Sequence, residues 1–167
     1  MQEAIYDWLL LFSLSQKENP VLKGVVDYRI KKYGFLPISR IFHIAPYLPY
    51  IELELRALLN KYQARRYLVH IRCAKEEDAK LFTAFYDAHL EAMVGKLEEA
   101  LNRAERAIFE LPERLQYASY SFRGFNTYLN LLEPILRVRG RRDLLEKVAE
   151  LKQKQGKLMV VLTTSKE

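Results

Sequence analysis

Residues 75–111 read KEEDAKLFTAFYDAHLEAMVGKLEEALNRAERAIFEL, a stretch with no proline and a single glycine, Gly95. Its apolar positions recur every three or four residues, which is the spacing of one face of an α-helix. These positions are Phe82, Phe85, His89, Met93, Leu97, Leu101, Ala104, Ile108 and Leu111. The stretch therefore predicts one helix, roughly 50 Å long. Because such a stripe must be buried against other elements, we expect a mainly α fold, a helical bundle around this long central helix.

The rest of the chain offers segments that would complete the bundle. The spacing of Ile5, Trp8 and Phe12 predicts a short amphipathic helix over residues 3–14. Further helices are expected over 20–33, 49–62, 112–123, 126–139 and 141–155. Gly34, Gly124 and Gly140 supply helix ends, with Asn19 and Pro20 as a capped start, and Pro134 should kink or split its helix.

Three segments do not show a clear helical period. Residues 35–49 hold three prolines and predict turns, with one helical turn at 38–44. The run at 67–73 is either a short strand or the end of the preceding helix, whereas 157–164 reads as a strand. Because a lone strand is unstable, a small two-stranded sheet of 67–73 with 157–164 is expected. The alternative is pairing with the same strand of a second subunit, in a homodimer or larger assembly.

The size and charge of the chain limit what it can be. At 167 residues, a single helical domain over residues 1–167 is expected. Lys and Arg outnumber Asp and Glu by 27 to 21, which gives a net charge of +6. A basic balance of this size favours nucleic acid or an acidic protein surface as partner. Few glycines beside many charged residues also suit a protein from a thermophile.

The cysteine content and the lack of recognisable targeting segments predict a protein of the cytoplasm. Cys73 is the single cysteine, so no disulfide can form within the chain, and a reducing compartment is expected. Glu3 and Asp7 stand where a signal peptide would carry positive charge. No stretch is long and apolar enough to span a bilayer, so no membrane partner is expected.

No pattern in the chain predicts a catalytic, metal or cofactor site. There are three histidines but no HExxH, no Walker loop and no GxSxG. We therefore expect a non-enzymatic protein with no cofactor. Arg72 and Lys75 flank Cys73 at an expected helix start, a setting that lowers a thiol pKa. The alternative for Cys73 is a buried structural cysteine.

Arg65 and Arg66 precede His70 by five and four residues. This spacing resembles the short Arg-to-His catalytic motif of HEPN-type ribonucleases, which are small helical proteins. The resemblance implies that the arginine and the histidine act at the 2′-hydroxyl and the scissile phosphate of RNA. Tyr67 stands where such motifs carry a polar residue, so the match is to the loosest form of the motif.

Basic segments carry most of the functional signal. The densest is RVRGRR at 137–142, where a turn at Gly140 would let the side chains fan out. An aromatic run with Arg123 inside it lies just upstream, at 117–128. Exposed rings beside basic side chains suit single-stranded nucleic acid, because rings stack on bases and arginines bind phosphates. The candidate nucleic-acid-binding residues are Arg137, Arg139, Arg141, Arg142, Lys147, Arg123, Arg65 and Arg66.

Three functional hypotheses follow from these patterns. The first is a helical protein that binds single-stranded RNA or DNA, or a small subunit of a nucleoprotein assembly. Small helical subunits of CRISPR effector complexes have this size and charge, which is an analogy of class only. The second is a protein–protein adaptor or self-assembling structural protein that uses tyrosine-rich surface. The third is the HEPN-type ribonuclease.

Overall fold

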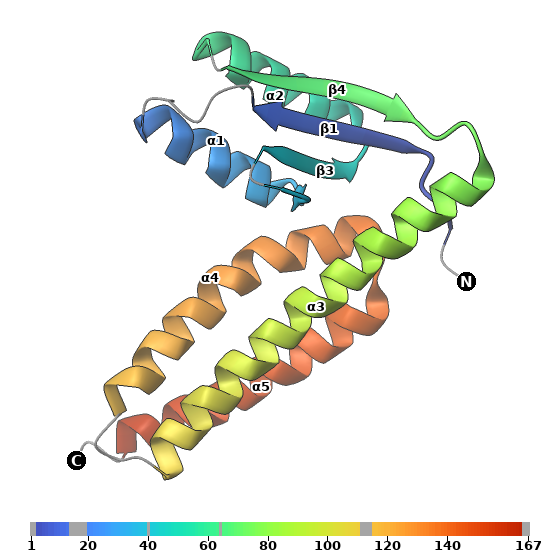
Figure 1. The fold of residues 1–167 in the computed structure, drawn as a ribbon. Helices are drawn as coiled ribbons and strands as arrows, with labels where there is room; N and C mark the ends of the chain where they lie inside the picture. The colour runs from blue at the N-terminus through green and yellow to red at the C-terminus, as the bar shows by residue number, and fades with distance from the viewer. Residues whose placement is uncertain (1–2, 14–19, 40, 64, 111–114, 165–167) are drawn as a thin grey trace. The chain divides into compact units, whose positions relative to one another are not determined.

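The computed structural model describes residues 3–13, 20–39, 41–63, 65–110 and 115–164. These residues form five helices and four strands, so the predicted mainly α fold is confirmed (Figure 1). The predicted long helix is also confirmed, as α3 (Glu76–Phe109). The chain divides into two compact units, residues 1–89 and 90–167, which are described separately. The expectation of a single domain stays a prediction.

The N-terminal unit contains a four-stranded antiparallel sheet. Its strands are β1 (Asp7–Ser13), β2 (Leu36–Pro37), β3 (Phe42–Pro46) and β4 (Arg66–Arg72), in the order β2-β3-β1-β4. Two helices join them, α1 (Pro20–Lys32) and α2 (Pro49–Lys61). The chain order β-α-β-β-α-β with these neighbours is the split β-α-β, or ferredoxin-like, arrangement.

The predicted helix over residues 3–14 is wrong, because this segment forms the central strand β1. Residues 8–12 are apolar without a break, which is typical of a strand covered on both faces. Leu9 and Leu11 point to one face of the sheet and are buried with α1 and α2. Trp8 points to the other face, where its ring lies 6.0 Å from Phe82 and 5.7 Å from Tyr86 of α3.

The core of the N-terminal unit lies between the sheet and α1 and α2. It holds Leu9, Leu11, Ala45 and Leu68 from the strands, with Val26, Ile30, Phe35, Ile51, Leu55 and Leu59 from the helical side. On the opposite face, the buried Tyr86 hydroxyl donates a hydrogen bond to the carbonyl oxygen of Gly34 at 2.7 Å. Gly34 has a φ of 74°, so it ends α1 in the left-handed conformation that its position predicted.

The predicted two-stranded sheet has the wrong partner. The segment at 67–73 is a strand, as one alternative held, but β4 pairs with β1. Residues 157–164 belong to α5 (Arg142–Thr164), where Leu158 and Leu162 continue the helical spacing of Leu151 and Gln155. The predicted helical turn at 38–44 is also wrong, since β3 begins at Phe42.

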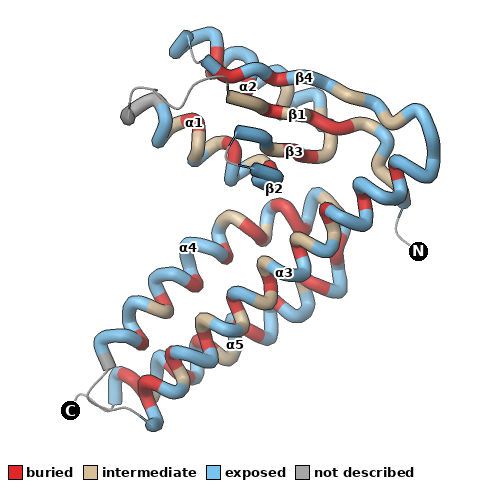
Figure 2. The backbone as a smooth tube through the Cα atoms, in the orientation of Figure 1, coloured by how far each residue is buried: buried red, intermediate tan, exposed pale blue. Residues whose placement is uncertain are grey.

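The C-terminal unit consists of the second half of α3 with α4 (Leu115–Arg139) and α5, which lie side by side in Figure 1. Two helices were predicted where α4 runs unbroken through Gly124 and Pro134. Figure 2 shows buried positions recurring along one side of each helix. The largest fully buried side chains are Phe125, Leu90, Leu97, Leu101, Leu132 and Leu136.

The predicted stripe of α3 is right in its second half and displaced by about one position in its first half. Leu97, Leu101, Ala104 and Ile108 are buried as predicted. Before them the buried residues are Ala79, Thr83, Tyr86, Leu90 and Val94, whereas Phe82 and Phe85 are exposed. Because the buried residues at 79 and 83 are a small alanine and a polar threonine, the spacing of large apolar residues did not indicate the buried face of α3.

Within the described residues, no helix combines the length and apolar character needed to cross a membrane. Three features expected from the sequence, the cap at Asn19, the restart at Pro112 and the apolar position Leu111, lie outside the described residues.

Candidate functional site

The predicted basic turn at 137–142 is held largely by carboxylates of its own unit. Arg141 has a side chain only 5% exposed, with Nη2 2.7 Å from Asp143 Oδ2 and 2.8 Å from Glu91 Oε1. The hydrogen bond from Arg141 lowers the pKa of Asp143 below its ordinary value, and burial opposes this shift. The structure thus shows the Arg141 guanidinium buried and held by two carboxylates, and its predicted role as a phosphate contact stays a prediction.

The neighbours of Arg141 differ from one another in accessibility. Arg137 Nη2 lies 2.7 Å from Glu133 Oε1, and Lys147 Nζ lies 2.8 Å from Glu98 Oε2. Both pairs are partly exposed, so water screens them and each contributes little. Arg139 is half-buried, whereas Arg142 is exposed. Of the four arginines that the sequence predicted to fan out, Arg142 and Arg137 are exposed, the second in a screened ion pair, whereas the other two are less accessible.

The aromatic run of α4 divides between the core and the surface. Phe122 and Phe125 are buried, which is the packing role expected from their spacing. Tyr117, Tyr120 and Tyr128 are exposed. With Gly124 they follow steps of three and four residues, so they share one side of α4. Arg123 is exposed next to this side.

The structure does not bring the ribonuclease-like pair together. Arg66 and His70 lie four positions apart on one strand, which separates their Cα atoms by about 13 Å. Arg66 is buried and donates to Asp27 Oδ1 at 2.9 Å. His70 stacks on Tyr47 at 3.9 Å between ring centroids, and its Nε2 lies 3.0 Å from Asp7 Oδ1. Arg66 and His70 are therefore each held by a different carboxylate, and the ribonuclease hypothesis stays a prediction.

Cys73 also differs from its predicted setting. Burial raises the pKa of its thiol, and the negative charges of Asp78 and Asp7 raise it further. The lowered pKa expected from Arg72 and Lys75 is therefore wrong.

Three aromatic rings form a cluster across three strands of the sheet. Phe12 lies opposite Phe42 of β3 and opposite Tyr67 of β4. Its ring centroid is 5.4 Å from Tyr67 at an interplanar angle of 23°, and 6.0 Å from Phe42 at 35°. Phe42 and Tyr67 remain 38% and 50% exposed. We call Phe12, Phe42 and Tyr67 the aromatic face.

The aromatic face lies on the side of the sheet opposite α1 and α2. Leu11 and Leu68, the chain neighbours of Phe12 and Tyr67, point into the core beneath those helices, and successive side chains of a strand alternate between faces. The rings stand at the end of the sheet where β1 ends and β3 and β4 begin. Here the neighbouring Val69 is also exposed. The result is an open apolar surface with one stacked and one tilted pair of rings.

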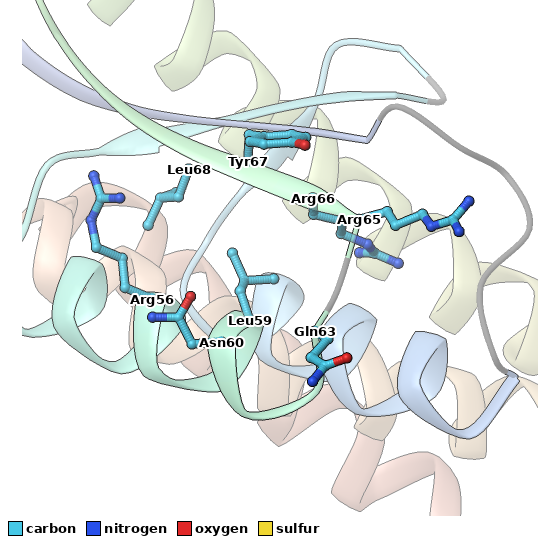
Figure 3. Close-up of a pocket in the computed structure, with 8 residues that line it drawn as sticks. All are labelled: Arg56, Leu59, Asn60, Gln63, Arg65, Arg66, Tyr67 and Leu68. Carbon is cyan, nitrogen blue, oxygen red and sulfur yellow. The ribbon is translucent and has the colours of Figure 1, made fainter.

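A pocket of about 560 Å³ adjoins this end of the sheet, between α2 and the edge strand β4. Figure 3 shows Leu59 near its middle, Leu68 beside Arg56 toward one end, and Arg65 with Arg66 at the other end. The residues that line it are Arg56, Leu59, Asn60, Gln63, Arg65, Arg66, Tyr67 and Leu68, and we call it the arginine pocket. Of the predicted residues, it brings together Arg65 and Arg66.

The three arginines of the pocket are engaged to different degrees. Arg56 donates from Nε and Nη2 to Glu52 Oε1 at 2.9 and 2.7 Å, and Arg66 is paired with Asp27. Arg65 is exposed and forms no ion pair with any residue that the structure describes. Arg65 is therefore the cation of the pocket that is open to an external anion.

The sequence patterns did not single out Phe12 and Phe42, and they placed Tyr67 only in a possible strand. The signal that could have found them is alternation: Leu9 and Leu11 on one face of a strand imply Leu10 and Phe12 on the other. The helical interpretation of residues 3–14 hid it. The pairing of β1 with β3 and β4, which aligns the rings, joins segments far apart in the chain and leaves no local mark.

Within the described ranges, no group of three or more His, Cys, Asp or Glu side chains is placed to hold a metal ion. Comparisons of the chain with family models, with curated proteins and with solved structures found no match.

Proposed function

We propose that this protein binds single-stranded nucleic acid through the aromatic face. The observation that carries the proposal is the cluster of Phe12, Phe42 and Tyr67 on an open sheet surface, in which Phe42 and Tyr67 are exposed. Every base has a π-face, and stacking a base on an aromatic side chain contributes about 1–3 kcal/mol. RNA-recognition modules use exposed rings on a four-stranded sheet to stack two or three bases. This precedent is an analogy of architecture, since a fold alone does not imply a function.

Positive charge near the aromatic face supports the proposal. Arg65 immediately precedes β4, and the exposed Lys61 ends α2, which runs toward the same end of the sheet. Phosphates of a strand whose bases stack on the rings would meet these cations. The net charge of +6 draws a polyanion toward the whole chain. Arg123 and Arg142 would add to that field from the C-terminal unit, with Arg137, Arg139 and Lys147 weakened by their internal partners.

The proposal includes a role as a small subunit of a nucleoprotein assembly in the cytoplasm, where single-stranded RNA is available. A protein–protein adaptor is the second candidate. The observation that favours it is the exposed tyrosine side of α4, formed by Tyr117, Tyr120 and Tyr128. Exposed apolar surface of this kind is typical of protein interfaces. The two candidates differ in salt dependence, because phosphate-led binding weakens as salt rises.

The direct test is fluorescence anisotropy with a labelled ten-nucleotide single strand over a series of salt concentrations. Phe42→Ala and Tyr67→Ala should each weaken binding by about 5- to 100-fold, the equivalent of one lost stacking interaction. Tyr28→Ala is the matched control, because Tyr28 is a comparably exposed tyrosine, at 60%, on α1. It should leave the affinity unchanged.

Two results would overturn the proposal. One is a wild-type protein that binds neither RNA nor DNA single strands at low salt, which would favour the adaptor. The other is an affinity that Tyr28→Ala lowers as much as Tyr67→Ala does. Circular dichroism of each variant separates lost binding from lost folding.

A further inference from the structure

We propose that the arginine pocket holds the nucleotide next to the stacked bases, with its phosphate on Arg65 and its base over Leu59 and Leu68. This inference rests on the proposed function and names a second subsite for the same strand. The volume of about 560 Å³ lies in the range of small-molecule sites. The apolar lining of the pocket comes from the exposed edges of Leu59 and Leu68, each 6% exposed, and arginines stand at both ends (Figure 3). Because Arg56 and Arg66 are already paired with carboxylates, a nucleoside with one phosphate on Arg65 has the matching pattern of charge and apolar surface.

The position of β4 connects the pocket to the aromatic face. β4 is an edge strand, with β1 as its one neighbour in the sheet order. Tyr67 belongs to both surfaces, since it lines the pocket and its ring stacks on Phe12. Figure 3 shows its ring on the side of β4 away from α2. A nucleic-acid strand with one base stacked on Tyr67 can therefore pass over the edge of β4 and place its next nucleotide in the pocket.

Two side-chain amides in the pocket offer groups that read a base. Asn60 and Gln63 each carry two N–H donors and a carbonyl acceptor. Neither side-chain amide hydrogen-bonds to another residue within the described part of the chain. The edges of bases present donors and acceptors in base-specific patterns. The pocket is thus the place where this protein would prefer one base over another.

The backbone at Gln63 gives a way to test its role. Gln63 has a φ of 48°, the left-handed region, directly after the end of α2 at Tyr62. Glycine is the ordinary residue at this position of a helix end, because a side chain is strained there. A glutamine that lines the pocket from a strained position costs stability, and contact between its amide and a ligand would explain why it is present.

The test compares three-, five- and ten-nucleotide single strands by fluorescence anisotropy. Wild-type affinity should rise from the three- to the five-nucleotide strand by more than the next five nucleotides add. Arg65→Gln should lose most of this first increase, about 5- to 10-fold, and should weaken binding of the three-nucleotide strand by a smaller factor. Its slope of log K against log salt should fall by about 0.7, the value for one phosphate of a single strand. Lys31→Gln, which removes an exposed cation at the end of α1, should leave the length increase unchanged.

Gln63→Gly provides a test whose expected result, a lower affinity, cannot be attributed to loss of folding. Its melting temperature should equal or exceed that of the wild type, because glycine relieves the strain. Its affinity for the five-nucleotide strand should nevertheless fall by about 2- to 5-fold, as expected for one lost hydrogen bond.

Two outcomes would overturn the proposal that the arginine pocket holds a nucleotide. One is a length increase that Arg65→Gln does not alter while Phe42→Ala still weakens binding, which would leave the aromatic face intact. The other is Gln63→Gly with wild-type affinity for every strand. Absence of wild-type binding to all three lengths would instead overturn the proposed function, and the pocket with it.

Discussion

Arg141 Nη2 donates to Glu91 Oε1 over 2.8 Å and so ties the start of α5 to α3. The same guanidinium binds both carboxylate oxygens of Asp143, from Nε and Nη2. The Arg141 side chain is 5% exposed, whereas its two carboxylate partners remain more than half exposed. The carboxylates therefore stay hydrated, while the buried arginine relies on them to compensate the charge that it has removed from water.

Arg141→Gln should destabilise the protein by about 2 kcal/mol, the usual contribution of hydrogen bonds to charged groups. Arg142→Gln is the control, because Arg142 is adjacent, equally basic and exposed. It should change the free energy of unfolding by less than about 0.5 kcal/mol. Urea unfolding of both variants measures the difference. Equal stabilities would show that the Arg141 pairs contribute nothing.

Acid should weaken the link between α4 and α5. Glu133 accepts from Lys152 Nζ at 2.6 Å and from Arg137 Nη2 at 2.7 Å. The hydrogen bond from Lys152, then that from Arg137, lowers the pKa of Glu133 below its ordinary value of 4.5. A lowered folded-state pKa stabilises the fold above the unfolded pKa, and this contribution disappears as the pH falls through the folded-state pKa.

Glu133→Gln should therefore be less stable than the wild type at pH 7, and the gap should close once the pH drops well below 4.5. Thermal unfolding from neutral pH down to strongly acidic pH measures this convergence. Glu146→Gln, which changes an exposed glutamate on α5, should show no such gap. A gap for Glu133→Gln that is constant with pH would argue against the ion pairs as its cause.

Two glycines should respond in opposite directions to the same substitution. Gly140 has a φ of 72° in the turn before α5, so Gly140→Ala should cost about 1 kcal/mol. Gly124 lies inside α4, and apart from the backbone of its own helix nothing lies within 4 Å of the position that a methyl group would take there. Gly124→Ala should then stabilise by about 0.5–1 kcal/mol through higher helix propensity. Differential scanning calorimetry that moved both melting temperatures the same way would contradict this assignment.

Substitutions in the two halves of the predicted α3 stripe should differ in their effect on stability. Leu101 is fully buried, so Leu101→Ala should cost about 2–5 kcal/mol. Phe85 is 53% exposed although the periodicity placed it on the same face. Phe85→Ala should cost less than about 1 kcal/mol. Chemical denaturation that ranked the two variants in reverse would restore the original stripe.

Local signals predicted α1, α2 and α3 well, although they divided α4 in two and ended α5 too early. The long uninterrupted period of α3, the proline at the start of α2 and the left-handed glycines at 34 and 140 all act within a few residues. A helix is stabilised by contacts three and four positions apart, so its presence is recorded in its own sequence. The failure at β1 has the opposite cause, because five consecutive apolar residues fit a helix and a doubly covered strand equally well.

The candidate site was less predictable than the fold. The rule that basic residues cluster at a binding surface led to the turn at 137–142, yet Arg141 is buried against Glu91, which lies 50 positions earlier. Conversely, Phe12 and Tyr67 carry no motif, and they become a surface only when β1 and β4 align. Charge counts report how much positive charge exists, but its accessibility depends on which carboxylates the fold brings beside it.

Composition and periodicity alone determine that this chain is basic, mainly helical and built around α3, since these properties sum over single residues or over one helical turn. Tertiary structure alone decides that residues 7–13 are a strand, that 157–164 continue α5, and that Phe12, Phe42 and Tyr67 share one face. The physical reason is the distance along the chain between the residues that stabilise each element. A strand has no hydrogen-bond partner of its own, so its existence, register and exposed face depend on segments that the chain brings in from far away.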